Sequence, residues 1–182
     1  MRKSRICHRA GQLLFLAPAL LAGCVSVPDG IEPVHDFDVQ RYLGTWYEIA
    51  RLDHSFERGL SNVSATYTRR DAGGIEVLNR GYHERSGKWK QAKGRAYLVG
   101  EPTTAHLKVS FFRPFYGSYI VIALEPDDYA YAMVCGANRS YLWILAREKT
   151  LDPSVRDDLL ARAQHLGFQT SELIFVEHNR SD

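Results

Sequence analysis

Alternation of apolar and polar positions dominates the chain between Gly44 and Glu148. Runs rich in Tyr, Val, Ile, Phe and Thr are separated by short clusters of turn residues such as RDAGG, ERSGK and GEPTT. Runs of this length and period, bounded by Gly, Pro, Asp and Asn, are typical of β-strands joined by tight turns. The pattern predicts eight strands, at residues 45–52, 62–70, 74–84, 88–99, 106–113, 118–125, 129–136 and 140–147.

The short connections between these runs favour an antiparallel meander. Eight strands close economically into an up-and-down barrel, because closure leaves no exposed strand edge. The first connection, DHSFERGLS, is the one long connection between predicted strands, and we interpret it as a lid. The predicted fold class is therefore all-β, an eight-stranded antiparallel up-and-down β-barrel.

A helical pattern follows the eighth strand. Asp152 and Pro153 are typical of a helix start and Gly167 of a helix end. One apolar stripe lies between them, made of Val155, Leu159, Leu160, Ala163 and Leu166. A surface helix must bury such a stripe, so we expect it to cover the outside of the sheet at Ala132, Val134, Leu142 and Ile144. Residues 172–178, ELIFVEH, predict a short ninth strand.

The N-terminus has the layout of an export signal. Arg2, Lys3, Arg5 and Arg9 precede the apolar run QLLFLAPALLAG. This run is too short for a membrane span, which needs about 20 apolar residues, and is typical of a secretory signal. Leu21 to Cys24, LAGC, resembles the lipobox of bacterial lipoproteins, which implies cleavage before Cys24 and lipidation of that cysteine. The alternative is an ordinary signal peptide with an incidental cysteine.

Ser26 replaces the aspartate that retains enterobacterial lipoproteins in the inner membrane, so the resemblance implies an anchor in the outer membrane of a Gram-negative bacterium. Several acyl chains, each gaining about 0.8 kcal/mol per buried CH₂, make such an anchor effectively permanent. We divide the chain into a signal peptide at 1–23, a lipidated tether at 24–43 and a barrel domain at 44–182.

Removal of the signal reverses the sign of the net charge. Four of the 23 basic residues lie in it, which leaves 19 against 21 acidic residues. Nothing in this balance points to a nucleic-acid partner. Cys7 leaves with the signal and Cys24 is consumed by the lipid, so Cys135 has no partner for an intrachain disulfide.

Three separated pieces of sequence converge at one end of such a barrel. Trp46, in GTWYE, begins the first strand and Arg147 ends the eighth, and antiparallel neighbours bring these two ends to the same rim. Asp128 and Tyr129, in EPDDY, fall there as well. An arginine stacked on an indole contributes about 2 kcal/mol when desolvated. A phosphate loop at Gly44 is disfavoured, because no second glycine or lysine follows at P-loop spacing.

The GTWYE motif, the DDY before the seventh strand and the arginine that closes the eighth resemble the three signature regions of the lipocalin family, which also has a single helix after its barrel. The resemblance runs from Gly44 to Val176, and NVSATYTRRDAGGIEVLNRG and YLWILAR are similar to the bacterial outer-membrane lipocalins and apolipoprotein D. It implies a ligand-binding calyx whose floor contains Gly44, Trp46, Asp128, Tyr129 and Arg147 in structural roles. The family also implies no catalysis and no cofactor.

An eight-stranded barrel is filled with side chains or holds one small ligand. If Arg147 faces the barrel interior, alternation along the eighth strand places Trp143 and Tyr141 inside as well. The other strands have no residue that fixes their facing in this way. The predicted ligand-binding residues are Trp143, Tyr141, Val63, Ala65, Tyr67, Val77, Asn79, Phe111, Tyr119, Val121, Tyr131 and Met133. A mostly apolar lining suits an acyl chain, so the expected ligand is a fatty acid or lysophospholipid. The alternative is that about half of these residues only pack against one another or against the helix.

Loops one, three, five and seven open at the opposite rim. They carry Phe56, Arg58, Arg85, Lys88, Phe115, Tyr116 and Arg139, and we expect the basic members to contact the lipid head group. Two rival functions stay open: an enzyme that uses Cys135 or Glu48, and an envelope interaction protein with a filled barrel. The histidines show no spacing typical of a metal site. The oligomeric state also stays open, with a homodimer among the alternatives.

Overall fold

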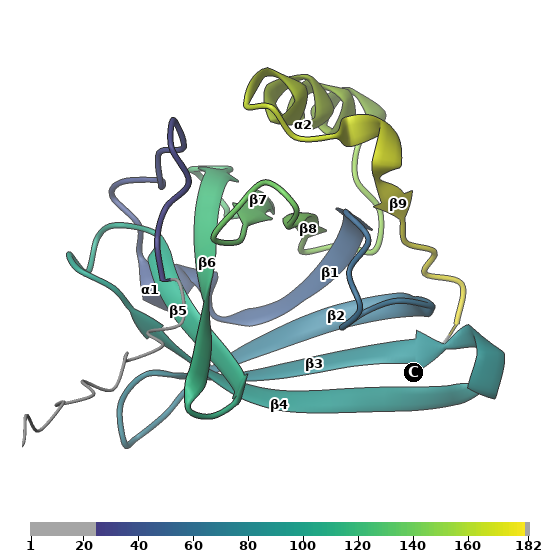
Figure 1. Cartoon of the computed structure of the whole chain (residues 1–182), viewed down its shortest axis with the longest axis horizontal. Helices are drawn as coiled ribbons and strands as arrows, with labels where there is room; N and C mark the ends of the chain where they lie inside the picture. The colour runs from purple at the N-terminus through teal and green to yellow at the C-terminus, as the bar shows by residue number, and fades with distance from the viewer. Residues whose placement is uncertain (1–24, 181–182) are drawn as a thin grey trace, which may run out of the picture.

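The computed structural model describes residues 25–180 (Figure 1). The signal peptide and the lipidation residue Cys24 therefore lie outside the described residues. Among the described residues, no helix is both long and apolar enough to span a membrane.

Eight strands close into one antiparallel barrel, as the polar and apolar pattern predicts. They are β1 Gly44–Arg51, β2 Leu60–Arg69, β3 Ile75–His83, β4 Lys88–Leu98, β5 His106–Phe112, β6 Phe115–Leu124, β7 Tyr131–Cys135 and β8 Leu142–Ala146. Neighbours in sequence pair from β2 to β8, β8 pairs with β1, and β1 pairs back with β2. The predicted closed barrel is confirmed.

Besides a ninth strand, four helical elements complete the structure of the described residues. They are helix α1 Val39–Tyr42, helix α2 Pro153–His165 and the 3-10 turns η1 Glu84–Ser86 and η2 Thr170–Glu172. The ninth strand β9 is present but short, Ile174–Phe175, and pairs with the end of β1 at Ala50 and Arg51. The predicted range 172–178 was too long because η2 occupies its first residue and β9 ends after two.

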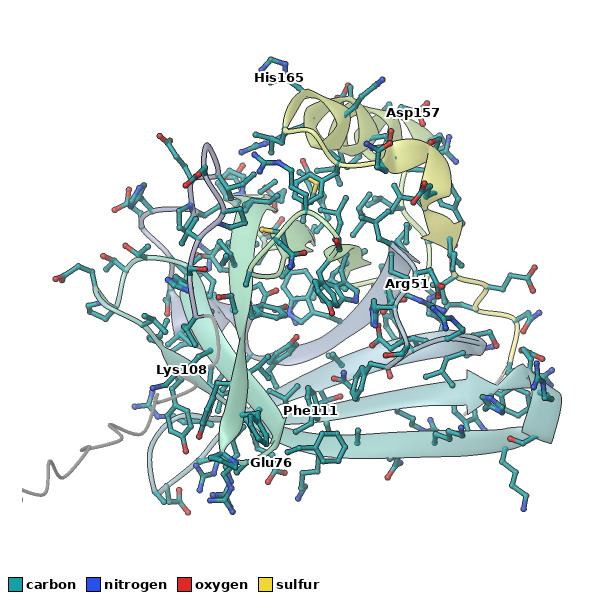
Figure 2. The ribbon with its side chains drawn as sticks, in the orientation of Figure 1. Arg51, Glu76, Lys108, Phe111, Asp157 and His165 are labelled. Carbon is teal, nitrogen blue, oxygen red and sulfur yellow. The ribbon has the colours of Figure 1, made fainter. Side chains whose placement is uncertain are left out.

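Helix α2 lies over the β7 and β8 side of the barrel (Figure 1). The Asp152 carboxylate accepts a 2.8 Å hydrogen bond from the Ser154 N–H, so the predicted cap is confirmed. The stripe is buried at Leu159 and Ala163, which pack in an outer cluster with Ile122, Leu142 and Ile144. On the opposite face of α2, Asp157 and His165 project away from the sheet (Figure 2).

The facing of β7 is the reverse of the prediction. Ala132 and Val134, expected beneath the helix, belong to the cluster inside the barrel, whereas Met133 packs in the outer cluster with Tyr131 at its edge. The reason is register, because Val134 pairs with Trp143 of β8, which faces inward. Paired residues of adjacent strands share a face of the sheet.

The segment before the barrel, which we predict to be a tether, packs against the barrel from Ile31 onward. Ile31, Phe37 and Tyr42 are buried. The Val34 N–H donates to the Val121 carbonyl at 2.9 Å, and the Ala105 N–H donates to the Val34 carbonyl at 2.9 Å. This segment therefore closes one end of the barrel, and Phe37 and Tyr42 join the inner cluster. A short segment rich in Asp and Pro gave no strand or helix period from which this packing could be recognised.

Candidate functional site

The closed end of the barrel is built around a cation–π contact. The Arg147 guanidinium carbon lies 3.9 Å from the centroid of the Trp46 ring. Arg147 also donates to three carbonyls, at Thr45 (3.0 Å), Arg41 (2.8 Å) and Tyr129 (3.3 Å). The indole N–H of Trp46 donates to the Tyr42 carbonyl at 2.9 Å. Each polar group of this plug therefore has a partner, and the plug leaves Trp46 fully buried.

Gly44 and Tyr129 fit this plug for different reasons, whereas Asp128 stands outside it. Gly44 has a φ of +96°, and a Cβ there would approach Nη1 of Arg147 to 3.3 Å. The Tyr129 hydroxyl accepts a 3.0 Å hydrogen bond from the Asp38 N–H. The Asp128 side chain is exposed, and its backbone N–H donates to the Glu125 carboxylate at 2.8 Å. Of the expected floor residues, Asp128 thus contributes a turn and no side-chain contact to the plug.

Above the plug lies a cavity of about 200 Å³. Its wall is mostly apolar, and the cavity is smaller than the roughly 300–1,000 Å³ of pockets for drug-sized ligands, which limits an occupant to a slender molecule. Nine of the twelve residues expected to contact a ligand line it: Val63, Ala65, Tyr67, Val77, Asn79, Phe111, Tyr119, Tyr141 and Trp143.

The other three expected ligand-binding residues do not line this cavity. Val121 belongs to the inner cluster but is covered completely. Tyr131 and Met133 lie on the outer face of β7, for the register reason given above. The cavity wall contains instead Leu107 and Val109 of β5, Leu145 of β8, and residues of the first loop.

Four polar residues at intervals of three along the chain form a buried cluster on one side of the cavity. Nη1 of Arg51 donates to Oε1 of Glu48 at 2.6 Å, and Nη2 of Arg51 donates to the Glu57 carbonyl at 3.0 Å. Nε2 of His54 lies 3.0 Å from Oε2 of Glu57, which also accepts a 3.0 Å hydrogen bond from the Trp143 indole. Glu48, His54 and Glu57 all line the cavity, and Arg51 is visible inside the fold in Figure 2.

The pKa values of the two carboxyl groups of this cluster are shifted in opposite directions. Burial, together with the negative charge of Glu57, raises the pKa of Glu48 well above its usual range, against the opposing effect of Arg51. Burial also acts against ionisation of Glu57, but hydrogen bonds from His54 and Trp143 outweigh it and lower the pKa of Glu57. The opposite shifts favour one neutral and one charged carboxyl group beside the guanidinium, which limits the net buried charge.

Sequence reasoning missed this cluster as a unit. It considered Glu48 as a general acid or as a polar residue of the barrel wall and the histidines only as metal ligands, and it left Arg51 and Glu57 out. The signal is the spacing itself, because Glu48, Arg51, His54 and Glu57 recur at every third position. The first loop, which we interpret as a lid, brings His54, Phe56 and Glu57 to the cavity wall.

Aromatic side chains surround the mouth of the cavity. Phe56 packs against Phe111 with ring centroids 5.0 Å apart, and Tyr141 stacks on Trp143 at 6.0 Å. Phe56 and Tyr141 are about 40% exposed, at 42% and 39%. A second hollow shares Phe56, Phe111, Tyr141 and Trp143 with the cavity and extends to Phe115 and Tyr116 of the β5–β6 hairpin. The apolar lining therefore continues to the protein surface.

The basic residues expected at the mouth have other roles or positions. Arg139 donates to the Leu166 carbonyl at 2.6 Å and to the Asp29 carbonyl at 2.7 Å, and so joins α2 to the N-terminal segment. Arg58 forms a 2.7 Å ion pair with Asp53. Arg85 and Lys88 lie exposed at the tip of the β3–β4 hairpin, which extends away from the barrel body (Figure 1). None of these four lines the main cavity.

Cys135, the nucleophile of the enzyme alternative, lies outside the cavity. Its side chain is buried in the outer cluster beneath α2. Burial raises the pKa of this thiol to about 12, so the reactive thiolate is disfavoured near neutral pH. This position separates Cys135 from any molecule inside the barrel.

Comparison with known proteins agrees with this architecture. Residues 37–178 match the model of the lipocalin-like domain family. The chain is 52% identical to the outer membrane lipoprotein Blc of Vibrio cholerae, over 90% of this chain and 96% of that protein. It is 35% identical to apolipoprotein D of the rabbit Oryctolagus cuniculus, over 79% of this chain and 83% of that protein.

Insecticyanin of the tobacco hornworm Manduca sexta has the same fold, with a TM-score of 0.67 at 24% identity over 83% of this chain and 85% of that chain. The barrel, its plug and these relatives together show that the chain belongs to the lipocalin family. The expected resemblance to bacterial outer-membrane lipoproteins and to apolipoprotein D is confirmed.

Proposed function

We propose that this lipocalin binds one single-chain lipid, a fatty acid or a lysophospholipid, inside its barrel and stores or carries it in the bacterial envelope. The observation that carries the proposal is the apolar cavity that opens between Phe56 and Tyr141 and ends at the plug. Each buried CH₂ of an acyl chain gains about 0.8 kcal/mol. The acyl chain of the lipid therefore supplies the affinity, while the lipid head group stays near the mouth of the cavity.

Attachment to the outer membrane through Cys24 is part of this proposal. The LAGC sequence and the name of the Vibrio cholerae relative, an outer membrane lipoprotein, support it. A carrier fixed to the membrane surface would take up and release single-chain lipids without leaving it. The filled-barrel alternative is disfavoured by the 200 Å³ cavity, and the Cys135 enzyme by the position of that thiol.

Filling the cavity tests the lipid-binding proposal. Ala65 lines the cavity wall on β2, so Ala65→Phe adds a ring to the space that the acyl chain would occupy. In a fluorescence displacement assay with hexadecanoate and a lysophospholipid, we expect Ala65→Phe to weaken binding at least tenfold. The control is Met133→Leu on the outer face of β7, a swap of similar volume that should bind as the unchanged protein does.

Three results would contradict the proposal. The first is that the unchanged protein binds neither lipid. The second is that the Ala65→Phe variant binds as tightly as the unchanged protein, and the third is that the control loses as much binding as Ala65→Phe does. Native mass spectrometry of protein extracted from its own membrane would identify a bound lipid directly, and a mass shift of one single-chain lipid is expected.

A further inference from the structure

Three tyrosine hydroxyls meet at the deep end of the cavity. The hydroxyls of Tyr42 and Tyr119 are 2.7 Å apart, and the Tyr67 hydroxyl donates to the Tyr119 hydroxyl at 2.9 Å. Tyr67 and Tyr119 line the cavity, whereas Tyr42 lies beneath them and is 1% exposed. The three residues come from β2, β6 and α1, so only the folded barrel joins them.

Counting hydrogen atoms shows that this cluster has one donor to spare. Three phenols carry three O–H hydrogens, and the two contacts use two of them. Among the described residues, no other acceptor forms a hydrogen bond with any of the three hydroxyls. A buried donor without an acceptor costs about 1–3 kcal/mol.

Burial decides which hydroxyl keeps the spare hydrogen. Tyr119 already accepts from Tyr67, and its contact with Tyr42 can run in either direction. If Tyr119 donated to Tyr42, the spare hydrogen would lie on Tyr42, beneath the cavity and out of reach of any ligand. If Tyr42 donates instead, the hydrogen of Tyr119 is left for an acceptor inside the cavity. The second arrangement avoids a permanently unpaired donor.

All three phenols stay protonated, which keeps them donors. Burial, as the main cause, raises the pKa values of Tyr42, Tyr67 and Tyr119. The guanidinium of Arg147, on the plug below, also gives this end of the cavity a positive potential. The acceptor-rich carboxyl groups of Glu48 and Glu57 belong to the separate cluster that includes the first loop.

We propose that Tyr119 donates a hydrogen bond to a neutral oxygen at the end of the ligand that enters the barrel first. The ligand class is then a linear chain with a hydroxyl or carbonyl group at its far end, such as an ω-hydroxy fatty acid. A carboxylate at the same place is disfavoured, because one hydroxyl does not compensate the burial of a charge. This inference rests on the proposed function, since it names the lipid that the cavity prefers.

The test compares hexadecanoate, 16-hydroxyhexadecanoate and hexadecanedioate in the displacement assay. The unchanged protein should bind the ω-hydroxy acid at least as tightly as hexadecanoate, and the diacid more weakly than either. Tyr119→Phe should weaken the ω-hydroxy acid about tenfold, which corresponds to one hydrogen bond of about 1.4 kcal/mol, and leave hexadecanoate within twofold. Tyr131→Phe on the outer face of β7 is the matched control, because it removes a tyrosine hydroxyl outside the cavity and should leave both affinities unchanged.

The outcomes separate this inference from the proposed function. If the unchanged protein binds hexadecanoate but binds the ω-hydroxy acid at least tenfold more weakly, the inference alone is overturned. Equal losses for both ligands in Tyr119→Phe, or tighter binding of the diacid than of the ω-hydroxy acid, also overturn it. If none of the three ligands binds, both proposals fail. The selectivity of the unchanged protein decides the matter even where Tyr119→Phe does not fold.

Discussion

Nη1 of Arg51 donates a 2.6 Å hydrogen bond to Oε1 of Glu48 inside the barrel wall, where the Glu48 and Arg51 side chains are only 3% and 2% exposed. Glu57 faces the same pair, and ionising two buried carboxyl groups near one guanidinium has a high free-energy cost. Glu48 is the group whose neutral form is favoured, since burial and the Glu57 charge raise its pKa well above the usual value. The stability of the barrel therefore depends on pH through this cluster.

Stability should fall as the pH rises through the raised pKa of Glu48. The folded protein holds a proton on Glu48 that the unfolded chain, with an ordinary pKa near 4.3, has already released. The contribution is fully present below the unfolded pKa and is lost above the folded one, with a slope of up to about 1.4 kcal/mol per pH unit. Denaturant unfolding as a function of pH measures it.

The matched variants are Glu48→Gln and Glu57→Gln. Glu48→Gln mimics the protonated carboxyl, so it should flatten the fall in stability with rising pH and cost little stability at low pH. Glu57→Gln removes the charge that Arg51 and His54 face, and should destabilise the protein by about 3–5 kcal/mol. An unchanged dependence of stability on pH in Glu48→Gln would show that another group causes it.

Trp46→Ala should destabilise the protein by about 3–5 kcal/mol, the range for emptying a buried aromatic site. Trp46 is fully buried between Tyr42 and Arg147, so its removal leaves a cavity in the plug. Trp89→Ala on the β3–β4 hairpin is the control and should cost less than about 1 kcal/mol, because Trp89 packs at the surface on Tyr82 and Arg80. Urea unfolding measures both; equal losses would contradict the structural role of the plug.

Arg139→Gln should lower stability by about 1–2 kcal/mol and leave lipid affinity unchanged. The side chain is half-buried and joins the end of α2 to the N-terminal segment through the Leu166 and Asp29 carbonyls, and hydrogen bonds to a charged group are worth about 1.5–3 kcal/mol before solvent screening. Lys88→Gln at the exposed hairpin tip should change neither quantity. A selective loss of lysophospholipid binding in Arg139→Gln would return this arginine to the head-group site.

Cys24→Ala should release the protein from membranes and leave the barrel folded. The residue precedes β1 by about 20 positions and lies outside the described residues. Its acyl chains, at about 0.8 kcal/mol per buried CH₂, would supply the attachment. Fractionation after a salt wash, with circular dichroism of the soluble protein, measures both parts. A variant that still sediments with the outer membrane contradicts lipidation at Cys24.

The sequence by itself determined the eight strands, the closed barrel and the capped helix, because each depends on local rules. Period-two runs with turn residues between them define the strands, and Asp152, Pro153 and Gly167 define the helix. The pairing of Trp46 with Arg147 also followed, since antiparallel order alone brings the start of β1 and the end of β8 together. The facing of Tyr141 and Trp143 followed from that same anchor.

Only the tertiary structure decided which face each remaining strand turns inward. A bulge between Val121 and Ala123 shifts the register of β6 against β7, and a one-residue shift turns every side chain to the opposite face. The residues of β7 are apolar on both faces of the strand, because one face packs beneath α2 and the other faces the barrel interior. Met133 and Val134 therefore could not be assigned from their neighbours in the chain.

The polar clusters were beyond the sequence for a related reason. Tyr42, Tyr67 and Tyr119 lie far apart in the chain, and nothing in the sequence around each tyrosine indicates which hydroxyls will meet. Glu48 and Arg51 lie on β1 on either side of a register irregularity between Glu48 and Ala50, and His54 and Glu57 join them because the first loop folds back over the barrel. Burial and hydrogen-bond geometry, which set the protonation of Glu48 and the spare hydrogen of Tyr119, exist only once the barrel has closed.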